Sequence, residues 1–299
     1  MKNYLKSFFE RYEYPEDSVK LLLDAYDILE NNSEFGEFLD RFYKEEDLGI
    51  DVITPAMKKI AADTGLHMYT VPFLYYICLS KELPKLYEAK GIDISVMWDS
   101  LWDFKYKLLE CLDVHGVPGF FSCGWFYDFM RAKLFKLGRL EYHIVTYNGA
   151  SVTVGKKELK AGDKFINMHI PSAKESFSAE VRYASYERAY NFFKQHTGED
   201  IDIFGCGSWL LFGKNREILD AKSNIISFMD DFKLTKSELY ENPRDDMWRI
   251  FGKYADAPAG ELPRDTSLRR AYADYLKTGG AGHGSGFFRW DKEKKQPTA

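Results

Sequence analysis

The first third of the chain carries apolar residues at helical spacing. One apolar stripe runs through residues 19–29 and a second through residues 35–42, each on one face of a helix. Thr54 followed by Pro55 is typical of a helix start, and Gly65 is suited to ending that helix in the left-handed conformation. We therefore expect residues 1–116 to form a bundle of amphipathic helices.

The pattern then becomes typical of β-strands. Residues 140–147 are rich in β-branched and aromatic side chains, and the Asn-Gly pair that follows them is a hairpin signal. Residues 152–155 and 164–170 are two further strand candidates. Because short connections join these three segments, they predict an antiparallel meander.

Helices and strands alternate in the rest of the chain. A helix should begin near Ser178 and end at Thr197 and Gly198. The segments after it predict, in order, a strand at 204–212, a helix through 218–229, a strand at 248–251, a helix at 266–276 and a closing strand at 286–290. The pattern as a whole predicts an α+β protein with a helical N-terminal domain in residues 1–116 and an α/β domain in residues 117–299.

Composition restricts the class of protein. A formal net charge of -5 does not suit a general nucleic-acid binder, which needs an excess of lysine and arginine. The N-terminus lacks a secretory signal, and the most apolar stretch, residues 71–79, is too short to cross a bilayer and is expected to be a buried helix. We therefore expect a cytoplasmic protein without membrane contact.

The cysteines do not indicate a metal site. Cys78, Cys111, Cys123 and Cys206 are far apart in the sequence and form no pair at zinc-ligand spacing. They are expected to be reduced structural thiols, and no metal is predicted.

Five short motifs resemble a family of bacterial acyltransferase-like proteins. They lie at residues 135–142, 168–171, 206–211, 223–225 and 262–270. Members of that family pair a helical N-terminal domain with a GNAT-like C-terminal domain. The resemblance implies a mixed, mainly antiparallel sheet flanked by helices, and acyl-CoA or acetyl-CoA as co-substrate.

A GNAT-like fold implies a particular place for the co-substrate. Two strands diverge, the pantetheine chain lies along one strand edge, and the pyrophosphate binds at the start of the next helix, where backbone amides lack partners. Family members use a glycine-rich loop there, whereas residues 170–178 of this chain contain no glycine. The candidate cofactor-binding residues are Ile170, Ser172, Lys174, Ser176 and Ser178, and Glu175 among them would repel a phosphate.

His169 is the candidate general base. It lies where the strand beside the slot should end, and a neutral imidazole can accept the proton of an attacking amine. The alternative is that a histidine two residues before a proline only forms a hydrogen bond within a loop.

Other candidate residues also have structural alternatives. Ser208 and Trp209 would lie across the slot as substrate contacts, although a tryptophan there is more often part of the core. Ser223 is a candidate proton donor to the thiolate, and Asn224 is a candidate substrate contact. Both fall inside a predicted helix, where side chains of these types often form hydrogen bonds with a neighbouring loop instead. Arg139 ends a basic stretch, residues 131–139, that could bind an anionic group of the cofactor or substrate. The alternative is that this stretch is a solvent-exposed edge whose long side chains extend into water.

The glycine-rich segment at residues 278–286 is read as a flexible turn. It lacks the Lys-Ser/Thr ending of a P-loop and follows a helix instead of joining a strand to one. No serine of the chain sits in a nucleophile elbow, so a hydrolase is not indicated.

The leading hypothesis is an acyl-CoA-dependent N-acyltransferase that acts on a small-molecule amine by direct attack. A second is that the GNAT-like domain has lost catalysis and binds a ligand or a protein. A third is a helical bundle that binds a small apolar ligand. The sequence gives no indication of the oligomeric state.

Overall fold

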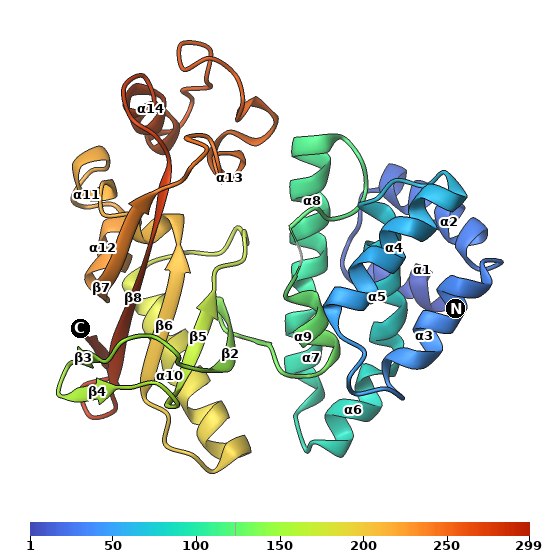
Figure 1. The fold of residues 1–299 in the computed structure, drawn as a ribbon, viewed down its shortest axis with the longest axis horizontal. Helices are drawn as coiled ribbons and strands as arrows, with labels where there is room; N and C mark the ends of the chain where they lie inside the picture. Colours follow the sequence, from blue (N-terminus) through green and yellow to red (C-terminus); the bar gives the residue numbers. More distant parts are fainter. Residues whose placement is uncertain (123) are drawn as a thin grey trace. The chain divides into compact units, whose positions relative to one another are not determined.

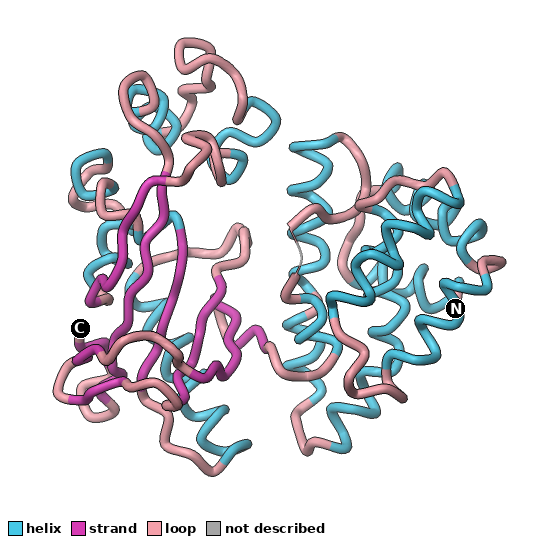
Figure 2. Tube along the Cα trace, viewed as in Figure 1, coloured by secondary structure: helices cyan, strands magenta, loops and turns pink. Residues whose placement is uncertain are grey.

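The computed structural model describes residues 1–122 and 124–299, and it divides into two compact units, Met1–Phe135 and Lys136–Ala299 (Figure 1). The first unit is helical and the second contains the sheet, as the secondary-structure colours show (Figure 2). An α+β fold is therefore confirmed. Cys123 lies outside the described residues.

The first unit is a bundle around one almost completely buried helix, α5 (Thr70–Leu79). Its elements are α1 (Lys2–Arg11), α2 (Glu16–Leu29), α3 (Ser33–Phe42), α4 (Ile50–Thr64), α5 (Thr70–Leu79), η1 (Ser80–Glu82), α6 (Leu83–Ala89), α7 (Ile94–Ser100), α8 (Trp102–His115) and α9 (Phe126–Met130). All residues of α5 except the half-buried Pro72 are buried, because this helix is apolar on all sides and packs against α2, α3, α4 and α9. The expectation for residues 71–79 is thus confirmed.

Helix α4 differs from its predicted start. It begins at Ile50, so Pro55 lies inside the helix and not at its first position. The predicted end is confirmed, since Gly65 has a φ of 69° and caps α4 in the left-handed conformation.

The helical unit also extends beyond the boundary expected at residue 116. Helix α9 follows that boundary, and its Phe126 ring packs on Phe104, with ring centroids 4.3 Å apart, and on Phe120 at 5.0 Å. Because these rings belong to the core of the bundle, the chain leaves the helical unit only at Phe135.

The second unit is built on a mixed sheet in the order β1-β2-β5-β6-β8-β7, with β9 paired to β8. These strands are β1 (Phe135–Leu137), β2 (Leu140–Thr146), β5 (Lys164–His169), β6 (Ile203–Ser208), β7 (Lys233–Leu239), β8 (Gly282–Asp291) and β9 (Gln296–Thr298). The pairs β2–β5, β6–β8, β7–β8 and β8–β9 are antiparallel, and β5–β6 is parallel. The sheet is therefore mainly antiparallel, as expected.

Helices lie between and after the strands. They are α10 (Ala179–Thr197), η2 (Trp209–Leu211), α11 (Asn215–Ile218), α12 (Asn224–Asp230), α13 (Trp248–Phe251), η3 (Gly252–Tyr254) and α14 (Ser267–Tyr275). Helix α10 covers one face of the sheet, where the ring of Tyr186 packs on Phe204 and Phe288 with centroids 5.9 and 4.8 Å away. Among the helices of the described residues, none has both the length and the apolar character that crossing a bilayer requires.

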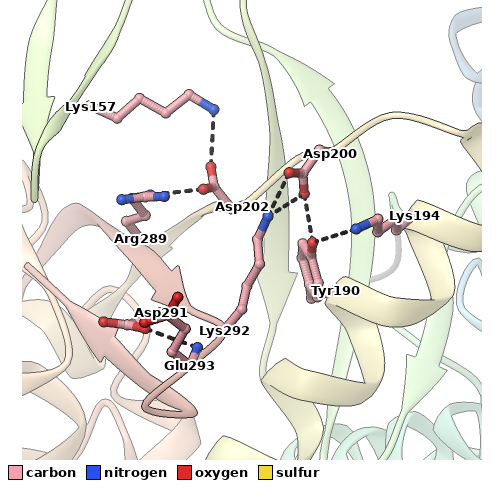
Figure 3. Close-up of polar contacts among 9 residues, drawn as sticks. All are labelled: Lys157, Tyr190, Lys194, Asp200, Asp202, Arg289, Asp291, Lys292 and Glu293. Carbon is pink, nitrogen blue, oxygen red and sulfur yellow. Dashed lines mark hydrogen bonds and ion pairs between the residues drawn. The ribbon is translucent and has the colours of Figure 1, made fainter.

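A short hairpin covers part of the other face. Strands β3 (Val152–Val154) and β4 (Lys157–Leu159) form it, and their apolar side chains pack against Phe165 and Phe287. Asp202, which is buried, accepts bonds from Lys157 of the hairpin at 3.0 Å and from Arg289 of β8 at 2.8 Å (Figure 3). This carboxylate therefore ties the hairpin to the sheet.

Several predictions for the C-terminal part were wrong. Strand β3 pairs with β4 in a separate hairpin while β2 pairs directly with β5, so the three predicted strands form no meander. The strand expected at 204–212 ends at Ser208, and the helix expected through 218–229 is two helices, α11 and α12.

Residues 248–251 form helix α13 and not a strand, because four residues are too few to show a period. Part of the glycine-rich segment is not a turn, since Gly282, Gly284 and Gly286 lie within β8. A Cβ at Gly284 would overlap the carbonyl oxygen of Leu211, so only glycine fits there.

Candidate functional site

Strands β5 and β6 separate beside His169. Their parallel pairing consists of Ile166 with Phe204 and Asn167 with Gly205, and it stops there (Figure 1). Beyond that point β5 stays paired to β2 as far as His169, and β6 stays paired to β8 as far as Ser208. The β5 edge that faces β6 thus has no strand partner over its last residues. The divergence implied by the family resemblance is present.

Helix α10 begins one short loop after β5. Ser178 is its N-cap residue and forms no hydrogen bond with its side chain to the first turn, and Gly198 ends the helix at a φ of 72°, as expected. Because first-turn amides have no partners within a helix, this end keeps its capacity to bind an anion. Ser172, Lys174 and Ser176 lie exposed in the loop, and Ile170 is half-buried at its start.

Three polar side chains meet on the face of β2 and β5. In the antiparallel register His143 lies opposite Asn167, and His169 is the next residue on the same face. The Asn167 Nδ2 atom lies 2.9 Å from His143 Nε2 and 3.4 Å from His169 Nε2, and the two Nε2 atoms are 3.3 Å apart. All three side chains are half-buried. The ring of His169 is therefore held by its neighbours while part of its side chain stays exposed.

The sequence analysis missed His143 and Asn167 as members of this group. The alternation of side chains along a strand, which places Asn167 and His169 on one face, was the signal available for Asn167. His143 and Asn167 each lie in a predicted strand, and His143 is two residues from Glu141, which pairs with His169. Only the register between the two strands decides that these side chains meet.

A cysteine lies on the strand across the divergence but is not a nucleophile at neutral pH. Cys206 on β6 is buried, and burial raises the pKa of its thiol to about 12. Since the thiolate is the reactive form, a covalent acyl-cysteine is disfavoured.

The Arg139 side chain contacts the loop after β5. It is buried, and its guanidinium donates to the carbonyl oxygens of Pro171 at 2.9 Å and Ala173 at 3.4 Å. Lys136 of the same basic stretch is also buried and pairs with Glu175 at 3.0 Å, whereas Lys133 is exposed, so only part of the stretch is a solvated edge. The role of Arg139 is therefore to hold the loop after β5.

Three of the four other candidate side chains have structural contacts. Ser208 ends β6, and its Oγ accepts the amide of Leu210, while Trp209 packs on Tyr272 with centroids 5.9 Å apart. Ser223 lies at the start of α12 and not inside it, where its Oγ accepts the amide of Ile226. Asn224, the first residue of α12, is exposed. None of these contacts brings the four to His169.

The described residues offer no metal centre. In residues 1–122 and 124–299, no three histidine, cysteine or acidic side chains gather in a group able to hold a metal ion.

Two family models match the sequence, one for each unit. The model described as an N-acyltransferase N-terminal domain matches residues 3–132, and the model described as a GNAT-like C-terminal domain matches residues 134–288. No curated protein matches significantly.

Several solved structures share the fold. A crystal structure of an acyltransferase with CoA and 10C-teicoplanin has a TM-score of 0.75 at 20% identity, covering 95% of this chain and 87% of that one. An acyltransferase with decanoyl-CoA and teicoplanin has a TM-score of 0.73 at 20% identity, covering 94% and 86%. A mutant acyltransferase with octanoyl-CoA has a TM-score of 0.73 at 20% identity, covering 95% and 87%.

Proposed function

This chain belongs to the acyltransferase family that joins an N-acyltransferase N-terminal domain to a GNAT-like C-terminal domain, and from that premise we propose that it transfers an acyl group from acyl-CoA to a small-molecule amine. The observation that carries the proposal is the divergence of β5 from β6 directly beside His169. Where two strands diverge, the edge of one can offer backbone groups to the amides of a pantetheine chain, and His169 lies at the end of that edge.

The co-substrate follows from the same geometry. Acyl-CoA would place its pantetheine along β5 after Asn167 and its pyrophosphate at the loop and first turn of α10. The similar structures contain CoA, octanoyl-CoA and decanoyl-CoA, which supports a CoA thioester and makes medium-chain donors a reasonable first test.

His169 would act as the general base. The neutral amine attacks the thioester carbonyl, a C–N bond forms, and His169 takes the proton that the nitrogen loses. The tetrahedral intermediate then breaks its C–S bond, and the CoA thiolate leaves and is protonated from solvent. His169 passes its proton to solvent before the next turnover, so the net products are an amide and free CoA.

His143 and Asn167 would support this step. In the tautomer that carries its hydrogen on Nδ1, each ring presents an Nε2 lone pair to the Asn167 amide nitrogen, which would donate to it and orient the ring. Once His169 is protonated at Nε2, that hydrogen can be shared with His143 Nε2 at 3.3 Å. The pair would therefore stabilise the proton while the thiolate departs.

The acceptor is proposed only as a class. One similar structure contains teicoplanin and another 10C-teicoplanin, which supports a small-molecule acceptor. We propose an amine for this chain because a base that removes one proton is what amide formation from a thioester needs.

Isothermal titration with CoA, acetyl-CoA and octanoyl-CoA tests the proposal. Binding of at least one of these with a Kd in the micromolar range is expected, and the same titration with ATP serves as the control for nonspecific phosphate binding. The absence of heat with every CoA ligand at high micromolar concentration would overturn the proposed function.

A further inference from the structure

The loop between β5 and α10 is held through its carbonyl oxygens. The two terminal nitrogens of Arg139 donate to Pro171 O at 2.9 Å and to Ala173 O at 3.4 Å. At the other end of the loop, Arg182 donates to Phe177 O at 2.8 Å. Both guanidinium groups also lie over the Phe177 ring, 5.4 and 5.3 Å from its centroid. Two arginines thus fix a loop that contains no glycine.

Binding these carbonyl groups also orients the amides beside them. In a trans peptide the N–H points opposite to the C=O of the same unit. The carbonyls of Pro171 and Ala173 face one guanidinium, so the N–H groups of Ser172 and Lys174 face away from it. Ser172 and Lys174 are exposed, whereas Arg139 is buried. The two amides are therefore directed to the outer side of the loop.

Glu175, the acidic residue of the loop, was expected to repel a phosphate, but its carboxylate has a cationic partner. Glu175 forms an ion pair with the buried Lys136 of β1 at 3.0 Å, so the negative charge of Glu175 is balanced by that lysine. Lys174, one residue earlier, is exposed and adds a positive charge near the two amides.

We propose that Arg139 is a positioning residue that turns the amides of Ser172 and Lys174 towards the pyrophosphate of the co-substrate. The inference rests on the proposed function and deepens it. Elsewhere in such folds glycine lets the backbone approach a phosphate, whereas here a buried guanidinium sets the direction of the peptide planes. Arg182 fixes the far end of the same loop and lets α10 start at Ser178.

Two ligands separate this role from a general structural one. Octanoyl-CoA carries the pyrophosphate, and octanoyl-pantetheine lacks it but can use the same strand edge. In Arg139→Lys the charge stays and the paired donation to two carbonyls is lost. We expect octanoyl-CoA to bind about tenfold more weakly or worse, since a hydrogen bond to a charged group is lost, and octanoyl-pantetheine to bind as in the wild type.

A second pair of variants tests the amide directly and does not depend on the buried arginine. Ser172→Pro removes the N–H at an exposed position, and Ser172→Ala keeps it while removing the hydroxyl. The proline variant should lose affinity for octanoyl-CoA about tenfold with octanoyl-pantetheine unaffected, and the alanine variant, which keeps the amide, should lose much less.

The outcomes distinguish the inference from the proposed function. If the wild type binds neither ligand, the proposed function fails. If the wild type binds octanoyl-CoA and Ser172→Pro binds it equally well, only the inference fails. The inference would also fail if Arg139→Lys lowered the affinity for octanoyl-CoA and octanoyl-pantetheine equally. The same holds if Ser172→Ala and Ser172→Pro lowered the affinity for octanoyl-CoA equally. If Arg139→Lys does not fold, the Ser172 pair decides.

Discussion

The Nε2 atoms of His143 and His169 lie 3.3 Å apart across β2 and β5, with the Asn167 amide in contact with both. Two N–H bonds cannot point at each other over that distance, so this space holds at most one proton. A hydrogen on one Nε2 atom would therefore face an acceptor on the other ring, which fits the role proposed for His169.

Replacing His169 with alanine should therefore reduce turnover and leave co-substrate binding intact. We expect kcat to fall about 10²–10⁴-fold, the usual contribution of a positioned general base, with an unchanged Kd for CoA. His196→Ala, at the far end of α10, is the control and should keep the full rate. A His169→Ala protein with every measurable rate retained would reject this base and favour a binding module without catalysis.

The start of α10 depends on a buried ion pair. Arg182 donates to Asp231 Oδ2 at 3.0 Å, both are nearly inaccessible, and the hydroxyls of Tyr183 and Tyr186 donate to the same carboxylate. Asp231→Asn leaves a buried guanidinium without its counter-charge, so we expect the free energy of unfolding to fall by about 3–5 kcal/mol.

Urea denaturation of Asp231→Asn beside Asp230→Asn measures this effect. Asp230 forms an exposed pair with Arg216, and its neutralisation should leave the unfolding midpoint unchanged. Equal midpoints for the two variants would mean that the buried pair contributes nothing to stability.

The thiols should be inert in the folded protein. Burial raises the pKa values of Cys78, Cys111 and Cys206 to about 12, so near pH 8 only about one in 10⁴ is a thiolate. In a Cys123→Ser background, a thiol reagent at pH 8 should label none of them within minutes and should label all three after unfolding in guanidinium. Rapid labelling of Cys206 in the native state would reopen the possibility of a covalent intermediate.

The elements beside the site were predictable because their signals are local. The start of α10 at Ser178 and its end at Gly198 follow from capping preferences, and the end of β5 at His169 follows from Pro171 two residues later. The divergence of β5 from β6 was expected only from the family resemblance, because no local sequence pattern indicates where two neighbouring strands separate.

Other features depend on contacts between segments that are distant in sequence. His143 meets His169 only through the β2–β5 register, and Arg139 turns inward to carbonyl groups of a loop that the sequence does not place next to it. Strand β7 was not predicted because nearly all of its residues are exposed, which leaves almost no apolar alternation to read. Ser223 was placed inside a helix because a capping serine next to an apolar run looks the same as an internal one.

The most direct test of the central claim is a crystal structure with octanoyl-CoA. The account predicts pantetheine along the β5 edge beyond Asn167, the thioester near His169 and the pyrophosphate against the amides of Ser172 and Lys174. An octanoyl-CoA molecule bound elsewhere, with that strand edge empty, would contradict it.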